Sequence, residues 1–180
     1  VAVGSNALDA NTTAANNVAV GHNALTANTT GASNVSVGFE SLKANTTGAS
    51  NIGIGTGALE ANTTASYNVG IGHDAMLSNT TGAQNTAVGY AALDAATTGN
   101  YLTAIGHNAL GANTTAGNNT SVGWNSMLAN TTGENNIAMG YKALNANTTA
   151  NDNTALGFEA LLVNTTGAEN TAVGANALDA

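Results

Sequence analysis

The chain contains no cysteine and no proline, and its only cationic side chains are Lys43 and Lys142. Without cysteine the fold has no disulfides and no thiolate chemistry, which suits an extracellular repeat. Without proline every backbone N–H is available to hydrogen-bonded ladders. Ten acidic residues give a net charge of −8, which argues against nucleic acid or an anionic membrane surface as a partner.

Charged residues and aromatic residues are also scarce, at 7% and 4% of the chain. An ordinary globular domain contains about 25% charged residues, so this composition argues against one. No apolar run reaches the roughly 18 residues of a membrane-spanning helix, and we expect no membrane insertion. No signal-peptide pattern is present, and the chain starts within a repeat. We therefore expect a segment of a longer fibre.

The chain does contain one 17-residue phrase, repeated ten times and followed by ten residues of an eleventh copy. Residues 18–34 read VAVGHNALTANTTGASN and residues 154–170 read TALGFEALLVNTTGAEN, with no insertion or deletion between copies. An unbroken short period predicts identical units that contact only their neighbours. We predict one continuous array over residues 1–180, an arrangement that disfavours an enzyme pocket.

The positions of the repeat, numbered from 1 at Val1, define columns that run through all copies. Column 3 is always apolar, column 8 is always Leu or Met, and column 1 is Val, Ile or Thr. The alternation predicts a short β-strand in which columns 1 and 3 share one face, and we expect columns 1, 3 and 8 to supply the core. Columns 2 and 7 hold only Ala, Ser or Gly, as expected where two backbones approach closely.

Glycine occupies column 4 in every copy, which predicts a corner with positive φ or a close approach of backbone. Column 17 is Asn except at Leu102, and aligned Asn residues favour an amide-to-amide ladder. Gly, Asn, Thr and β-branched residues are weak helix formers. We therefore predict an all-β parallel β-solenoid or β-roll with one repeat per coil, about 10.6 coils, and a rod roughly 50 Å long. The structural glycines are Gly4, Gly21, Gly38, Gly55, Gly72, Gly89, Gly106, Gly123, Gly140, Gly157 and Gly174.

The stretch NTAVGYAA at residues 85–92, which recurs as NTAVGANA at residues 170–177, resembles the head repeats of trimeric autotransporter adhesins of the YadA type. The whole phrase, with its Asn-Thr-Thr-Gly turn, is similar to repeats of phage tail fibres and bacterial surface fibres. The resemblance implies a left-handed β-roll, three chains side by side, and a fibre outside a cell or virion. The coil is longer than that of the adhesin head, which implies a wider corner at the turn.

Column 5 gathers all three histidines, both phenylalanines and the only tryptophan. Such a stripe suits a sugar or a partner surface, or it shields the glycine corner of an adjacent coil. The histidines are too far apart along one chain to share an ion, although three chains could bring identical histidines together on an axis. We expect no metal, no cofactor and no catalytic residue. The candidate contact column is His22, Phe39, His73, Tyr90, His107, Trp124, Tyr141 and Phe158.

The Asn-Thr-Thr turn has three interpretations, because it is a turn, a glycosylation acceptor and a regular polar array. A flat Thr array on a β-solenoid is typical of ice-binding proteins, but here the two Thr residues are adjacent, so only one per coil faces each way. The candidate polar ladder is Asn11, Thr13, Asn28, Thr30, Asn45, Thr47, Asn62, Thr64, Asn79 and Thr81.

The hypothesis that the sequence favours is a structural and adhesive segment of an extracellular fibre. Each coil has a thin core, which favours a homo-oligomer, with a trimer preferred. Repeated surface contacts with a cell-surface or glycan receptor would gain strength by multivalency. The alternatives are an ice-binding solenoid and a subunit of an end-to-end filament, since no polar cap closes either end of the array.

Overall fold

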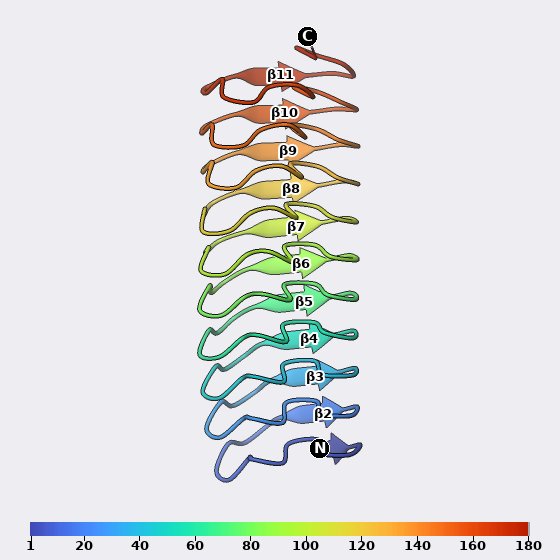
Figure 1. The fold of residues 1–180 in the computed structure, drawn as a ribbon, viewed down its shortest axis with the longest axis vertical. Coiled ribbons are helices and arrows are strands. Elements are labelled where there is room, and N and C mark those ends of the chain that lie inside the picture. Colours follow the sequence, from blue (N-terminus) through green and yellow to red (C-terminus); the bar gives the residue numbers. More distant parts are fainter. Residues whose placement is uncertain (180) are drawn as a thin grey trace.

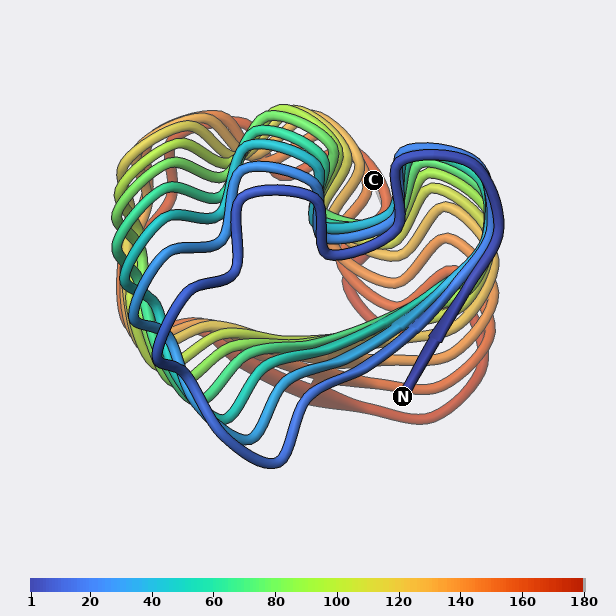
Figure 2. The same cartoon turned by 90° about the horizontal axis from the view of Figure 1, so that it is seen from below.

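A computed structural model describes residues 1–179 as a rod of stacked coils (Figure 1). Eleven parallel strands form one sheet in sequence order, and the described residues contain no helix. The predicted all-β parallel solenoid is therefore confirmed. Figure 2 looks along the rod from its N-terminal end, and the chain runs counterclockwise as it recedes, so the coil is left-handed. The strands are β1 (Ala2–Val3), β2 (Val18–Val20), β3 (Val35–Val37), β4 (Ile52–Ile54), β5 (Val69–Ile71), β6 (Thr86–Val88), β7 (Thr103–Ile105), β8 (Thr120–Val122), β9 (Ile137–Met139), β10 (Thr154–Leu156) and β11 (Thr171–Val173).

The strands pair in a constant register, and each residue lies beside the residue 17 positions later. Val18 pairs with Val35 at one end of the array, and Thr154 pairs with Thr171 at the other. One repeat therefore makes one coil throughout. A chain with an unbroken period can adopt this register in every coil because no insertion shifts the columns.

Backbone hydrogen bonds join the coils around the whole perimeter, beyond the short strands. The N–H of Leu25 donates to the carbonyl of Ser41 at 3.0 Å, and the N–H of Thr46 donates to the carbonyl of Thr63 at 2.8 Å. Because most of each coil takes part, turns that would be loops in a globular domain here have ladder partners. Backbone pairing offsets part of the free-energy cost of ordering a coil that has a small core.

The core lies on the opposite side of the strands from the side we expected. Ala19 is fully buried, whereas its neighbours Val18 and Val20 are half-buried on the outer face of the sheet. Columns 1 and 3 therefore face outward, which corrects the prediction that they supply the core. The reason is space: a Cβ on Gly70 in column 2 would lie 3.1 Å from the side chain of Leu59 in column 8, so only small residues fit inside.

Columns 2, 7 and 8 form the apolar core, with Ala19, Ala24 and Leu25 fully buried in the second coil. Column 8 is reached through a left-handed backbone turn, and Leu42 has a φ of 50°. Columns 6 and 16 also adopt positive φ, as at Asn23 (55°) and Tyr67 (64°). A residue in the left-handed backbone conformation changes the chain direction sharply. The three corners at columns 6, 8 and 16 therefore let 17 residues close a narrow coil.

The column of glycines meets both conditions that the sequence suggested. Gly21 has a φ of 138°, which other residues rarely adopt. A Cβ at Gly21 would also collide with the carbonyl oxygen of Gly38 in the next coil. The close approach is between coils of one chain, and it explains why no other residue occupies this column.

Candidate contact surfaces

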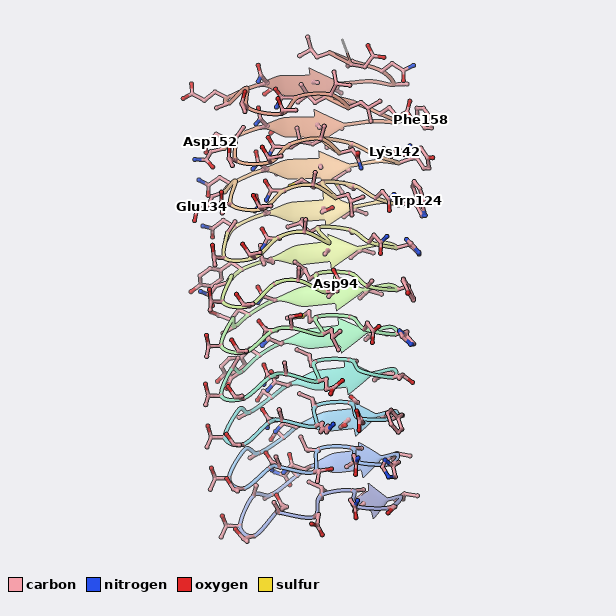
Figure 3. All side chains as sticks on the ribbon, viewed as in Figure 1. Asp94, Trp124, Glu134, Lys142, Asp152 and Phe158 are labelled. Carbon is pink, nitrogen blue, oxygen red and sulfur yellow. The ribbon has the colours of Figure 1, made fainter. Side chains whose placement is uncertain are left out.

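The rings of column 5 stack on one another along the edge where the strands end. Six consecutive coils form an unbroken stack from His73 to Phe158, with ring centroids 5.0–6.0 Å apart and interplanar angles of 6–22°. His22 and Phe39 form a separate pair at 5.4 Å. Figure 3 shows Trp124 and Phe158 on this edge. Stacking at one ring per coil follows from the strand spacing, and each pair adds a modest stabilisation.

Stacking decides which parts of the rings meet solvent. Phe39, Tyr90 and Phe158 have exposed fractions of 50%, 52% and 49%, but rings inside the stack cover the faces of their neighbours. A sugar or a flat partner group needs an uncovered face, so the inner rings present only their edges. Uncovered faces occur where the column is interrupted, at Ser5, Thr56 and Ala175.

Charged residues of column 6 lie beside these rings. The ammonium of Lys142 lies 5.7 Å from the ring centroid of Trp124 and 5.5 Å from that of Tyr141, which is cation–π geometry. Nδ1 of His73 lies 3.0 Å from Oδ2 of Asp74. Rings and charges therefore form one mixed surface along this edge.

Lys43 carries the other positive charge, and two carboxylates surround it. Its ammonium lies 3.0 Å from Oε1 of Glu40 and 3.6 Å from Oε1 of Glu60. The hydrogen bond to Lys43 lowers the pKa of Glu40, and a second hydrogen bond from Asn23 acts in the same direction. The hydrogen bond to Glu40 raises the pKa of Lys43. Because solvent still reaches all three side chains and screens their charges, the cluster contributes to the surface charge more than to stability.

The opposite edge of the rod carries columns 15 and 16. Glu134 and Asp152 lie there, as Figure 3 shows. Tyr67 and Tyr101 occupy the same edge and expose 65% and 60% of their surface. The sequence reasoning concentrated on column 5 and missed these two tyrosines, although their shared position 16, two repeats apart, is visible in the sequence.

The Asn-Thr-Thr turn places its three side chains in three different environments. The Asn side chains of column 11 point inward, and Asn28, Asn45 and Asn62 are fully buried. The next hydroxyl donates to the following coil, as from Thr46 to the carbonyl of Thr63 at 3.1 Å. The second Thr is exposed in every coil. The residues named as a polar ladder therefore divide into a buried Asn column and an exposed Thr column that share no surface. The exposed column is Thr13, Thr30, Thr47, Thr64, Thr81, Thr98, Thr115, Thr132, Thr149 and Thr166.

Burial also bears on glycosylation. Seven of the nine Asn-Thr-Thr asparagines are fully buried, and only Asn11 and Asn164 near the two ends of the rod are partly exposed. A glycan requires an accessible amide nitrogen, so attachment at the buried positions requires that the coil open first. The buried positions are Asn28, Asn45, Asn62, Asn79, Asn113, Asn130 and Asn147.

The amide ladder predicted for column 17 runs through column 11, and in column 17 an amide-to-amide bond joins Asn170 to Asn153 at 3.1 Å. In column 11 the Nδ2 of Asn45 donates to Oδ1 of Asn28 at 2.9 Å. In column 17 the side chains bond mainly to backbone: Asn34 Oδ1 accepts from the N–H of Asn51 at 2.9 Å, and Nδ2 of Asn51 donates to the carbonyl of Ala65 at 2.8 Å. The backbone N–H and carbonyl groups beside column 17 form hydrogen bonds with the Asn side chains of that column.

The coil of residues 86–102 interrupts both Asn columns, because it carries Ala96 in column 11 and Leu102 in column 17. Both residues are buried in the core. Oδ1 of Asn79, which would accept from an asparagine at position 96, has no hydrogen-bond partner. Leu102 fills space next to the turn, since a Cβ on Gly99 would lie 3.0 Å from its Cδ1. An apolar pair thus replaces two amides.

Columns 9 and 10 form a shallow groove along the rod. One section, of about 740 Å³, is lined by Thr26, Ala27, Lys43, Ala44, Glu60, Ala61, Leu77 and Ser78. A smaller section of the groove borders Asp94. Partial burial raises the pKa of the Asp94 carboxyl group, and the nearby charge of Asp74 also raises it. Backbone hydrogen bonds partly oppose this shift.

The described residues contain no group of three His, Cys, Asp or Glu side chains placed to hold a metal ion. Within this chain the imidazole of His107 stacks between the rings of Tyr90 and Trp124. Residues 1–179 also include no helix long and apolar enough to cross a membrane.

Comparisons of the chain with protein-family models, with curated proteins and with solved structures find no match.

Proposed function

We propose that this chain is a structural and adhesive segment of an extracellular fibre, located at a cell surface or on a virion. Its coils form a stiff spacer, and its surface columns make weak, repeated contacts with a cell-surface or glycan receptor. Weak contacts repeated along several rods gain strength by multivalency. The observation that carries the proposal is the regular rod itself, which presents the apolar side chains of column 3 on the outer face of its sheet in every coil.

The outer sheet face consists of column 3, which is apolar in every coil, and column 1, which is Val, Ile or Thr. Ile54, Ile105 and Met139 expose 37%, 40% and 44% of their surface, and no described segment of the chain packs over them. Ten strands of three residues and one of two give a face of roughly 500 Å² at the usual strand dimensions. A continuous patch of this size is at the upper end of what monomeric proteins expose, and such patches mark interaction sites.

We propose that neighbouring copies of the chain cover this face. A stable interface usually buries about 800 Å² on each partner, which is more than the strand face alone provides. In a ring of three chains each copy contacts two others, so the strand face and its flanks are buried together. This arrangement agrees with the trimer implied by the adhesin resemblance, and it compensates for the thin core of a single coil.

Charge substitutions on the face test the association. We expect Ile54→Glu and Ile105→Glu together to convert the oligomer to monomers in sedimentation velocity, because the carboxylates would be buried without partners. Thr64→Glu, which adds the same charge on the exposed turn, is the matched control and should leave the oligomer intact. A wild-type chain that sediments as a monomer at micromolar concentration would contradict the proposed association.

Adhesion needs a separate measurement. Beads that carry many copies of the rod should bind cells or a glycan array more strongly than the same number of separate rods. Equal binding, or no binding on any surface, would remove the adhesive part of the proposal and leave a spacer.

Ice binding is the alternative that one observation favours, namely the row of exposed Thr side chains in column 13. The burial of the Asn column leaves a single row rather than a grid, which weakens this alternative. Thermal hysteresis of the purified segment would support ice binding, and its absence would exclude it. A filament of rods joined end to end is the remaining alternative, and electron microscopy of native material would distinguish it from separate fibres.

A further inference from the structure

The stack of rings in column 5 is interrupted inside the rod at Thr56. Phe39 ends the lower pair and His73 begins the upper stack. These two rings belong to coils two steps apart, so about 10 Å separates them at the usual strand spacing. Neighbouring rings in the column are 5.0–6.0 Å apart. One ring is therefore missing from an otherwise regular stack.

The place of the missing ring is open to solvent. Thr56 is exposed and its side chain is too short to cover a ring, and the next residue is Gly57, which has no side chain. Faces of Phe39 and His73 are therefore uncovered toward the gap. Outer faces at the ends of the column, on His22 and Phe158, have no second ring opposite them. The gap at Thr56 is the place within the described column where two uncovered ring faces lie on opposite sides of one opening.

Carboxylates lie at the rim of the gap on both sides. Asp74 follows His73, and its Oδ1 lies directly beside the Cα of Gly57, since a Cβ there would be 2.5 Å from it. Glu40 follows Phe39, and it accepts hydrogen bonds from Asn23 at 3.2 Å and from Lys43 at 3.0 Å. The carboxylates of Asp74 and Glu40 outnumber the single ammonium of Lys43, so the rim of the gap has a net negative charge. A cation or a hydrogen-bond donor at the edge of a bound ring is favoured there.

We propose that this gap binds a single flat aromatic ring that carries a cationic or hydrogen-bond-donating group at its edge. A ring placed midway lies about 5 Å from each neighbour, the spacing at which aromatic rings attract in offset stacks. The ring belongs either to a small aromatic amine or to an aromatic side chain beside a basic residue of a partner protein. The site involves one chain and one edge of the rod, so it does not depend on assembly into a fibre.

Titration of the full chain with tryptamine tests the proposal by proton NMR. We expect upfield shifts of the indole protons, caused by the two flanking rings, and a dissociation constant in the millimolar range, as for small weak ligands. Thr56→Phe completes the stack with a residue that column 5 already accepts, and it should weaken binding at least tenfold. Ala175→Phe adds a ring at the end of the column without closing the gap, so it should bind tryptamine like the wild type.

Two further probes define the ligand class. Indole-3-acetate has the same ring with a negative charge and should bind severalfold more weakly than tryptamine. A short Lys-Trp-Lys peptide separates the two sources: tighter binding than tryptamine indicates a partner protein, and weaker binding indicates a small amine. Equal binding of tryptamine to Thr56→Phe, or binding of methyl β-glucoside in place of tryptamine, would overturn the proposal.

Discussion

The Nδ2 of Asn28 donates a 2.9 Å hydrogen bond to Oδ1 of Asn11, one coil away, and a second 2.9 Å bond to the carbonyl of Gly31 in its own turn. One buried amide thus fixes a turn and links it to the next coil. The same pair of bonds recurs at Asn45 and Asn62. Column 11 is for this reason both a turn motif and the polar centre of the core.

Removal of one ladder amide from the middle of the rod should be costly. In Asn62→Ala, the Oδ1 of Asn45 loses its donor and the Nδ2 of Asn79 loses one of its two acceptors, both at 2.9 Å, while Nδ2 of Asn79 keeps its bond to the carbonyl of Gly82. Buried polar groups without partners cost about 1–3 kcal/mol each, so we expect a loss of about 2–4 kcal/mol in urea unfolding. Thr64→Ala in the same turn is exposed and should change stability by less than about 0.5 kcal/mol. Equal effects of the two variants would contradict the ladder.

The two exceptional residues of the coil 86–102 should depend on each other. Ala96→Asn alone places an amide beside the buried Leu102, and Leu102→Asn alone leaves a space at Ala96. Ala96→Asn supplies a donor for Oδ1 of Asn79, which has no partner, and Leu102→Asn in the double variant removes the apolar side chain next to the new amide. We expect a favourable coupling energy of at least about 1 kcal/mol in a double-mutant cycle. Additive effects would show that the two positions are independent.

Two glycines in one coil should respond differently to the same added methyl group. Gly55 has a φ of 130° and its Cβ would collide with the backbone of Gly72, so Gly55→Ala should cost more than about 3 kcal/mol. Gly57 has a φ of 67°, in a column where Ala91 adopts 49°, and the atom its Cβ would meet is the carboxylate of Asp74, which can move. Gly57→Ala should cost about 1 kcal/mol or less. Thermal unfolding followed by circular dichroism measures both, and similar losses would argue against the close packing of the glycine column.

Asp94 should make the rod less stable as the pH rises. Burial raises the pKa of its carboxyl group, and Asp74 adds to the effect, so the folded chain binds the proton more tightly than the unfolded chain. Its stabilising contribution is complete below the unfolded pKa and is lost as the pH rises through the folded pKa. Asp94→Asn should therefore be more stable than the wild type at pH 7, by less than about 1 kcal/mol because solvent screens a half-exposed group.

The difference between Asp94→Asn and the wild type should shrink toward pH 3, where both side chains are neutral. Asp9 lies in the same column with an exposed side chain, so Asp9→Asn controls for the loss of one negative charge. Unfolding curves between pH 3 and pH 7 give the comparison. A difference that stays constant over this range would contradict the assigned cause.

The repeat period was sufficient to predict the solenoid, one coil per repeat and the glycine corner. It was insufficient to choose the inner face of the strand, because both faces carry residues of constant type: Val18 and Val20 suggested a core, yet Ala19 occupies it. Size decided the outcome, since column 8 already fills the narrow interior. The hydrophobicity of the residues alone does not indicate how large a side chain the interior of the coil can hold.

The geometry of column 5 and of the Asn-Thr-Thr turn needed the structure. Stacking of rings such as Tyr90 and His107 follows from their positions 17 residues apart, yet the sequence alone leaves open whether a ring lies along the column or points away. Burial of the Asn side chain in an Asn-Thr-Thr turn was not predictable either, because the same letters suit an exposed turn.

The constant strand register makes the coils nearly interchangeable, and this affects how the chain finds its native pairing. Strand β4 could pair with β6 as well as with β5 if backbone alone decided, with 17 residues looped out. Breaks in the columns do not prevent such an error. Omission of coil 86–102 would bring Asn79 next to Asn113, and omission of coil 52–68 would bring Phe39 next to His73, so each would restore an interrupted column. The coils that carry Thr56, Ala96 and Leu102 are therefore the ones that the chain could most easily skip while it folds.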